Sequence, residues 1–190
     1  MEDFTSDPTI LNVVKYGLVL NFVNVPPPRS PSVYNLCETD ACLVDSKVSS
    51  LLAKGVILPS SVQDDDYFSP VFPRINKDGS VRLLLNLSHL NTHIHHQHFK
   101  MESFKDVRCM VTKGCWMASV DLKSAFYSIP IHPTHRKYLK FFWKRPYEYV
   151  VMPNGYSDAP RVFTKVSKPG FAELRAAGHL SVVFLDDSYL

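Results

Sequence analysis

The chain has 190 residues, of which 45% are apolar and 21% charged, and its formal net charge is +3. It contains no run of eighteen apolar residues, so we expect neither a membrane span nor a membrane partner. The mildly basic balance permits a nucleic-acid partner without requiring one.

The N-terminus and the cysteines indicate a compartment. The first residues, Met1-Glu2-Asp3, are acidic and lack the basic start and apolar run of a secretory signal. Cys37, Cys42, Cys109 and Cys115 lack paired Cys-x-x-Cys spacing, so we interpret them as reduced thiols and not as a zinc site or disulfide frame. We expect an intracellular protein of the cytoplasm or nucleus, not a secreted one. The sequence makes no prediction of the oligomeric state.

Residues 1–36 are predicted to form an N-terminal extension and linker, followed by a larger unit over 37–190. Asp7 and Pro8 indicate the start of a short helix. Three prolines at 26–28 indicate an extended linker. We expect this segment to lie along the larger unit, because it would not fold alone.

A helix is predicted over 39–54. Thr39 or Asp40 can cap its start, and Gly55 ends it. One apolar stripe at helical spacing would face the core. This stripe consists of Leu43, Val44, Val48, Leu51 and Leu52.

A β-hairpin is predicted from two apolar runs, 71–75 and 81–85. The Asp-Gly pair between them favours a tight turn, because glycine tolerates positive φ. Two cations, Lys77 and Arg82, lie at or near its tip. By themselves these cations indicate no more than a solvated hairpin.

The second half begins with a predicted helix over 103–113, with Val107 and Val111 facing inward. A strand is expected to run from 116 to Asp121, and a second hairpin follows over 139–151.

A further helix is capped by Ser157 or Asp158, and Pro169 inside it should kink or weaken it. The apolar run 182–185 then predicts a strand with two adjacent carboxylates at its tip.

Three carboxylates therefore stand at the ends of two predicted strands: Asp121 on one, and Asp186 and Asp187 on the other. Oxygen ligands of this kind suit Mg²⁺. The order of elements predicts an α+β fold, with a mostly antiparallel sheet and helices packed on one face. The acids would meet if their strands are neighbours in the sheet, which periodicity alone does not decide.

Residues 67–190 resemble the reverse transcriptases of retroelements. Three blocks in the family's order carry the likeness: 119–131, 152–165 and 184–187, the last a variant of an aromatic-x-Asp-Asp box. Upstream, 77–82 and Leu90-Asn91 resemble the fingers hairpin and the segment after it. The amino-acid sequences of the second block and of the N-terminal segment are most similar to those of tyrosine-recombinase (DIRS-like) retrotransposons.

This resemblance implies the fingers and palm of a right-hand polymerase, truncated before the thumb. The chain stops at Leu190, inside the strand after the Asp-Asp turn, so we expect neither a thumb nor an RNase H domain within it. The implied activity is that of an RNA-directed DNA polymerase. It would extend a primer on an RNA or DNA template with deoxynucleoside triphosphates.

The resemblance also implies the metal ligands. Asp121 and Asp186 would bridge two Mg²⁺ ions, with Mn²⁺ as an alternative, and Asp187 would support them. The carbonyl of Leu122 would add a ligand. The same three acids would be the catalytic residues.

Nucleotide contacts follow from the same likeness. Lys77 and Arg82 match cations that clamp the triphosphate, and Arg74 is a rival for the lysine's role. Phe126 matches the bulky aromatic under the sugar that selects deoxyribose, and its neighbour Tyr127 could be confused with it.

Asn154 and Gly155 would lie against the incoming nucleotide and the template. Ala159, Arg161 and Phe184 would contact template or primer.

Several departures from the family pattern keep other hypotheses open. Phe184 stands where tyrosine is usual, and Asp158 puts an acid near the expected template path. One alternative is a non-catalytic retroelement remnant or a nucleic-acid-binding module that kept the fold. A cyclase or another palm-domain nucleotidyl enzyme is a third interpretation, which leaves Lys77 and Arg82 unexplained.

Overall fold

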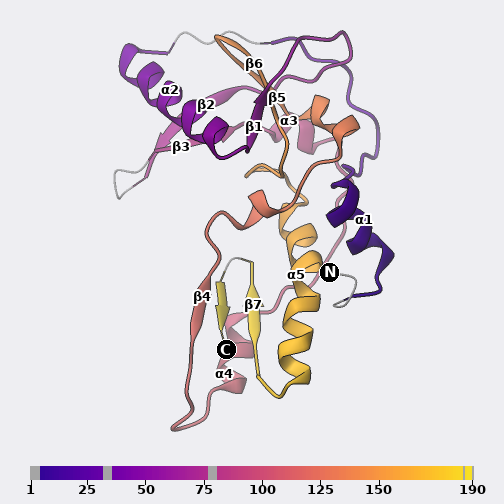
Figure 1. Cartoon of the computed structure of the whole chain (residues 1–190), viewed down its shortest axis with the longest axis vertical. Coiled ribbons are helices and arrows are strands. Elements are labelled where there is room, and N and C mark those ends of the chain that lie inside the picture. The colour runs from indigo at the N-terminus through magenta and orange to yellow at the C-terminus, as the bar shows by residue number, and fades with distance from the viewer. Residues whose placement is uncertain (1–4, 32–35, 77–80, 186, 190) are drawn as a thin grey trace.

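The computed structural model describes residues 5–31, 36–76, 81–185 and 187–189. Figure 1 shows an elongated molecule in which helix α5 (Ala159–Ala176) runs down from an upper group of strands and lies beside a smaller lower group. All pairings between named strands in these ranges are antiparallel, as predicted. The described strands form three small sheets, whereas the sequence suggested one.

Helix α2 (Glu38–Ala53) packs on the strands of the upper group, beside the hairpin of β2 (Val71–Ile75) and β3 (Val81–Leu85). The hairpin confirms the predicted strands, and its turn lies outside the described residues. The predicted cap of α2 was wrong. Cys37 is the N-cap, with extended φ and ψ of −65° and 160°, so Thr39 and Asp40 already belong to the first turn.

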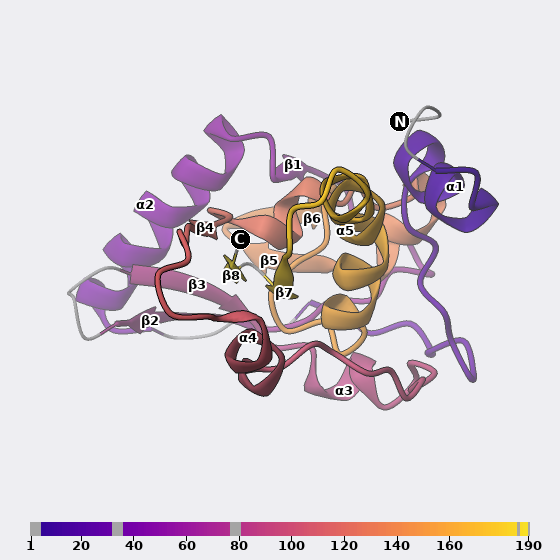
Figure 2. The same ribbon diagram turned by 90° about the horizontal axis from the view of Figure 1, so that it is seen from below.

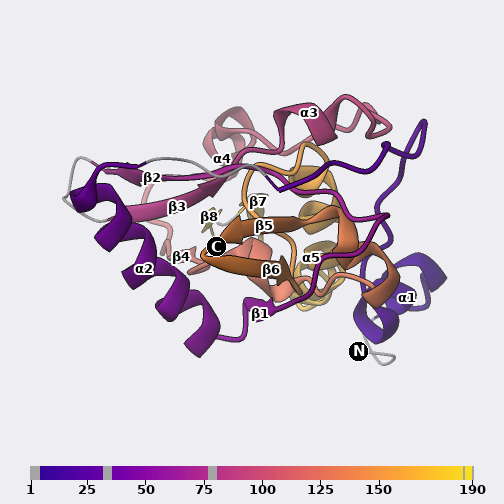
Figure 3. The same ribbon diagram turned by 90° about the horizontal axis from the view of Figure 1, so that it is seen from above.

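The central sheet has the order β1-β6-β5 and lies beside α2 (Figure 3). Strands β5 (Lys140–Trp143) and β6 (Arg145–Tyr149) form the second predicted hairpin, and β1 (Ile57–Pro59) pairs with β6. Phe141 stacks on Tyr147 with ring centroids 5.4 Å apart, and both rings are buried in the core.

The N-terminal segment lies along the larger unit, as expected. Helix α1 (Pro8–Tyr16) begins at the predicted cap, since the Asp7 carboxylate accepts the Thr9 N–H at 2.8 Å. After the helix, Leu18 donates its N–H to the Pro130 carbonyl at 2.7 Å and is buried in the core. This contact ties the segment to the β-bridge residues Pro130 and Ile131, just before the short 3₁₀ helix η2 (Pro133–Tyr138).

Two short helices connect the upper group to the lower one. Helix α3 (Ser88–Asn91) follows β3, and α4 (Phe104–Met110) comes before the lower sheet. Helix α4 starts at a capping box of Ser103 and Asp106 and ends three residues earlier than predicted. Val111, expected to face inward, is 44% exposed because it lies past the helix end.

The lower sheet has the order β4-β8-β7, with strands β4 (Ser119–Asp121), β8 (Asp187–Tyr189) and β7 (Val182–Phe184). Strand β4 is shorter than predicted and exposed along its length, and Trp116 before it is 99% exposed. Helix α5 starts after Asp158, one of the two predicted caps, and continues through Pro169 as one helix. Over the described part of the chain, we find no helix with the length and hydropathy needed to span a membrane.

Candidate active site

A cavity of about 520 Å³ opens between α2, β3 and the segment that leads from β4 into the short 3₁₀ helix η1 (Ala125–Ser128). Five of the residues singled out from the sequence line it. They are Arg82, Asp121, Leu122, Phe126 and Asn154. Residues separated by more than seventy positions in the chain are thus brought to one hollow.

The strands that carry the acids are neighbours, joined through β8. In the register of the lower sheet, Asp121 of β4 is the cross-strand partner of Asp187 of β8. Cross-strand partners in an antiparallel pair have Cα atoms about 4.5–5.5 Å apart. Figure 2 shows β4, β8 and β7 gathered together near the end of the chain. The third acid, Asp186, lies outside the described residues.

Asp121 offers oxygen ligands at the cavity. Its side chain is exposed and makes no hydrogen bond or ion pair to any other described residue. The Asp121 carboxylate and the Leu122 carbonyl, both at the cavity, offer the oxygen ligands that suit a hard cation. Of Asp187 the structure describes only the backbone, so the contributions of Asp186 and Asp187 to a metal site stay predictions.

Leu185, which directly follows β7, has a strained backbone. Phe184 and Asp187 are cross-strand partners, so only Leu185 and Asp186 lie between them. Leu185 has a φ of 55°, in the left-handed region that costs an L-residue about 1–2 kcal/mol. Backbone strain of this kind persists where the surroundings fix the geometry.

A carboxylate clamp fixes the outer strand of this sheet. Glu102, before α4, accepts the Val183 N–H at 2.7 Å and the Arg175 guanidinium at 2.7 and 3.0 Å. Arg175, near the end of α5, also donates to the carbonyl and hydroxyl oxygens of Ser181. The clamp thus ties α5 and the segment before α4 to β7, two residues from the acidic turn.

Aromatic rings form another part of the cavity wall. Phe126 is half-buried and meets Phe163 of α5 edge to face, with centroids 5.8 Å apart. Tyr127 also lines the cavity, and burial raises the pKa of its phenol. The Asn154 amide approaches the Tyr127 hydroxyl at 3.5 Å, a long contact. Position alone therefore does not decide whether Phe126 or Tyr127 is the predicted aromatic residue under the sugar. Of the two, Phe126 packs against a second aromatic ring.

The loop before α5 is positioned by Asn91. The Asn91 amide donates to the Gly155 carbonyl at 2.8 Å, and its oxygen accepts the Ser157 N–H at 3.0 Å. Gly155 has a φ of 96°, and a Cβ there would lie 3.4 Å from the Leu85 carbonyl. Glycine and asparagine together therefore hold this loop against the end of β3.

Arg161 is engaged with a neighbour. Its guanidinium donates two hydrogen bonds of 2.6 Å to the buried Asp158 carboxylate, which raises the pKa of Arg161. Ala159 is buried at 1% exposure, so its side chain makes no direct surface for a template. Contacts of these residues with nucleic acid stay predictions.

The other predicted nucleotide-, template- or primer-binding residues either do not line the cavity or lie outside the described residues. Gly155, Ala159, Arg161 and Phe184 are not among the described residues that line it. Lys77 lies outside the described residues, and Arg74, its rival, does not line the cavity.

Four residues of this region were not predicted from the sequence: Lys47, Lys54, Asn91 and Glu102. The seven-residue spacing of the two lysines on a predicted helix was the available signal, since it places them on one face. Asn91 was noted only as part of a resemblance. No local pattern indicated that Glu102 would reach β7.

Comparisons with known proteins identify the family of the chain. The model of the family described as reverse transcriptase (RNA-dependent DNA polymerase) matches residues 75–190. The chain is 23% identical over 138 residues to the Pro-Pol polyprotein of Simian foamy virus type 1, covering 72% of the chain and 12% of that protein. It is 28% identical over 113 residues to the genome polyprotein of Petunia vein clearing virus, covering 59% of the chain and 5% of that polyprotein.

Solved structures show the same fold. The chain is similar to the Prototype Foamy Virus Protease-Reverse Transcriptase, with a TM-score of 0.70 and 23% identity, over 90% of the chain and 22% of that protein. A foamy viral protease-reverse transcriptase in complex with RNA/DNA hybrid gives a TM-score of 0.71 at 17% identity, over 90% and 22%. The α+β fingers-and-palm fold predicted from the sequence is therefore confirmed.

Proposed function

The chain belongs to the reverse transcriptase family, and on this premise we propose that it forms the fingers and palm of an RNA-directed DNA polymerase. In this proposal, 37–190 make that unit and 1–36 an extension packed along it. The reaction would join a deoxynucleotide to a primer 3′-hydroxyl. The observation that carries the proposal is the register of Asp121 against Asp187, at a cavity that Arg82 and Phe126 also line.

We assign the metal ligands to Asp121, Asp186, Asp187 and the Leu122 carbonyl. Two Mg²⁺ ions, or Mn²⁺ in their place, would lower the pKa of the attacking hydroxyl and stabilise the leaving pyrophosphate. The exposed Asp121 carboxylate, without a partner among the described residues, supports this assignment.

The side chains of the cavity would bind and orient the nucleotide. The Arg82 guanidinium can grip a phosphate with two parallel hydrogen bonds, and Lys77 would add a point charge. Phe126 would stand under the sugar and exclude a ribose 2′-hydroxyl, and its packing on Phe163 supports a fixed ring position. Asn154 and Gly155 would lie against the base pair being formed.

The finer parts of the proposal concern partners and origin. Template and primer would pass near Ala159, Arg161 and Phe184, and relatives solved with dsDNA and with RNA/DNA hybrid support nucleic acid as the partner. We propose an origin in a DIRS-like retrotransposon from the amino-acid sequence of the second block, 152–165. We also propose that the protein acts in the cytoplasm or nucleus.

The test is addition of one nucleotide to a DNA primer on an RNA template, with protein in excess and Mg²⁺ present. Asp121→Asn should slow this addition by at least about 100-fold, because it removes a charged ligand where transition-state charge is stabilised. Asp64→Asn, which changes an exposed acid that does not line the cavity, should leave it unchanged.

The rival function is binding without catalysis. The pairing of Arg161 with Asp158 favours it, because that pairing occupies a cation expected to face the template. Template–primer binding with no Mg²⁺-dependent addition in the unmodified chain, under conditions where binding is saturated, would favour this rival.

A further inference from the structure

Helix α2 turns one face toward the cavity. Lys47, Ser50, Leu51 and Lys54 all line it, at the i, i+3, i+4 and i+7 spacing of a single helix face. Leu51 is buried and anchors this face on the core, while Lys54 is exposed and Lys47 half-exposed. The two lysines are therefore set toward the hollow by a helix that is fixed in place.

This face carries only positive charge. Within the described part of the chain, neither Lys47 nor Lys54 forms an ion pair. The acids of α2 lie elsewhere: Glu38 and Asp40 are in the first turn, and none of the helix's acids lines the cavity. Asp45 is taken up by the β5–β6 hairpin, where Lys144 Nζ and Trp143 Nε1 donate to it at 2.7 and 2.8 Å.

The described lining of the cavity has an excess of positive charge. It contains four cations, Lys47, Lys54, Arg82 and Lys123, and one carboxylate, Asp121. An excess of one sign of charge in a hollow concentrates ligands of the opposite sign. Phosphate groups are the ligands that amines and guanidinium groups bind in this setting.

We propose that Lys47 and Lys54 form a second phosphate-binding site, on α2, which holds the backbone of a single nucleic-acid strand. Seven residues of α-helix separate the lysines by about 10 Å along the axis. A nucleic-acid strand carries a phosphate at every nucleotide, about 3.4 Å apart along the axis when the strand is in a duplex, so phosphates of one strand can meet both ammonium groups. A triphosphate is one compact group, which Arg82 and the metal ligands would hold from β3 and β4. That this strand is the template rests on the proposed function.

The experiment measures binding of a fluorescent single-stranded RNA across a salt series, without divalent metal, primer or nucleotide. Each lysine–phosphate contact on a single strand contributes about 0.7 to the slope of log K against log salt. The Lys47→Ala/Lys54→Ala variant should therefore lose about 1.4 from this slope. The Lys47→Arg/Lys54→Arg variant should retain it.

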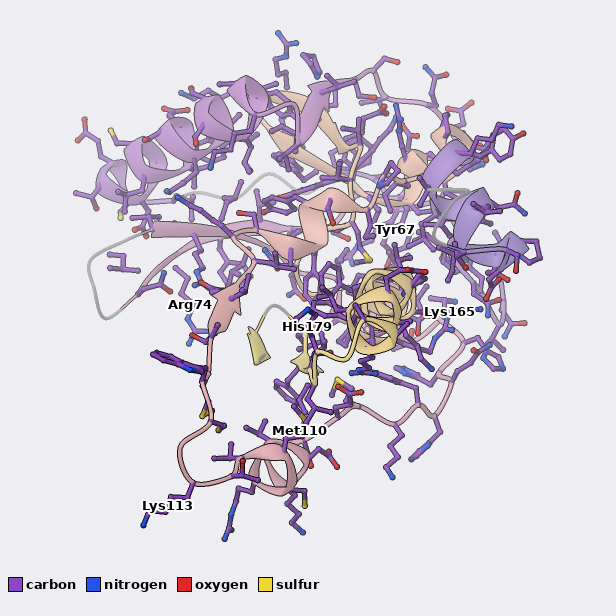
Figure 4. The ribbon with its side chains drawn as sticks, turned by 60° about the horizontal axis from the view of Figure 1, so that its bottom comes forward. Tyr67, Arg74, Met110, Lys113, Lys165 and His179 are labelled. Atoms are coloured by element: carbon purple, nitrogen blue, oxygen red, sulfur yellow. The ribbon has the colours of Figure 1, made fainter. Side chains whose placement is uncertain are left out.

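A matched control removes the same charge elsewhere. Lys105→Ala/Lys113→Ala changes two exposed lysines that do not line the cavity, and Lys113 lies beyond α4 at the far end of the molecule from α2 (Figure 4). This control should lose much less of the slope. Circular dichroism would check that each variant is folded.

Three outcomes would overturn the inference: equal loss of slope in both alanine variants, no binding by the unmodified chain at low salt, or an unchanged slope with weaker binding of a deoxynucleoside triphosphate. The last would place the lysines on the triphosphate. The binding experiment measures no nucleotide addition. A lysine-dependent slope can therefore be observed even if Asp121→Asn does not slow nucleotide addition. If nucleotide addition is normal but the Lys47→Ala/Lys54→Ala variant keeps the slope of the unmodified chain, the lysine site is refuted and the proposed polymerase function stands.

Discussion

Gly17 ends α1 in a backbone conformation that only glycine adopts readily. Its φ is 95° with a ψ of 161°, and an added Cβ would lie 2.5 Å from the His132 backbone nitrogen. We expect Gly17→Ala to lower the free energy of unfolding by more than about 2 kcal/mol, since strain and a backbone clash add. Urea unfolding would measure this change.

Gly170 provides the matched control. It lies inside α5, where an added Cβ meets nothing within 4 Å. Gly170→Ala should therefore raise the free energy of unfolding by up to about 1 kcal/mol through helix propensity. A similar change of the same sign in both variants would show that the backbone at Gly17 does not require glycine.

At the residue scale, the sequence predicted several of the residues that line the cavity but not the ion pairs that residues near it form. Arg82, Phe126 and Asn154 were named in advance and line one cavity. The pairing of Arg161 with Asp158 was missed, although their i, i+3 spacing could have indicated it. Asp158 was predicted as a helix cap and as an acid near the template path, and its ion pair with Arg161 was not predicted.

At the scale of elements, strand β7 illustrates how a sheet edge can be held by side chains. β7 is the outer strand of the order β4-β8-β7, and the Val183 N–H donates to the Glu102 carboxylate and not to a further strand. An edge strand otherwise leaves such groups to water. The Glu102 carboxylate thus accepts a hydrogen bond that the carbonyl of a further strand would otherwise accept.

Removing this clamp should loosen the strand that precedes the acidic turn. Glu102→Ala leaves the Val183 amide without its acceptor, at a cost of about 1–2 kcal/mol. We expect faster hydrogen exchange at Val183 in this variant. Glu102→Gln keeps an acceptor oxygen and should exchange more slowly than the alanine variant. Equal exchange at Val183 in the unmodified chain and in Glu102→Ala would show that the clamp does not protect the strand.

Element prediction from the sequence was strongest where patterns are local. The β2–β3 strands and helix α1 were predicted from apolar runs, an Asp-Gly pair in the sequence and an Asp cap, and both the strand pairing and the helix were confirmed. Strand β8 was expected only from the family resemblance, because three residues after a two-residue turn give no periodicity to detect. Its pairing with β4, which brings Asp187 opposite Asp121, depends on contacts across more than sixty residues.

At the scale of the whole molecule, the division of the described strands into three sheets was not predicted. Antiparallel pairing was correctly predicted, but sequence pattern does not show where one sheet ends and another begins. The N-terminal segment was expected to lie along the larger unit, and the bond from Leu18 to Pro130 shows one place where it does. Long-range packing decides both features.

The net charge of the whole chain limits its grip on nucleic acid. Affinity for a phosphate backbone comes mainly from the number of neutralised phosphates, and the chain has a net charge of only +3. We expect residues 1–190 alone to bind a template–primer with a dissociation constant on the order of 10⁻⁵ M near physiological salt. Association must also offset lost translational and rotational freedom.

Extension by these residues alone should therefore be poor, with release after each addition. Primer extension with an excess of unlabelled template–primer added as a trap would measure it, because released protein is then captured. Products no longer than one added nucleotide are expected with the trap, and lowering the salt should strengthen binding before it lengthens products. Long products in the presence of the trap would show that these residues hold a primer–template through successive additions. The cavity cations would then contribute more to the affinity for nucleic acid than the net charge indicates.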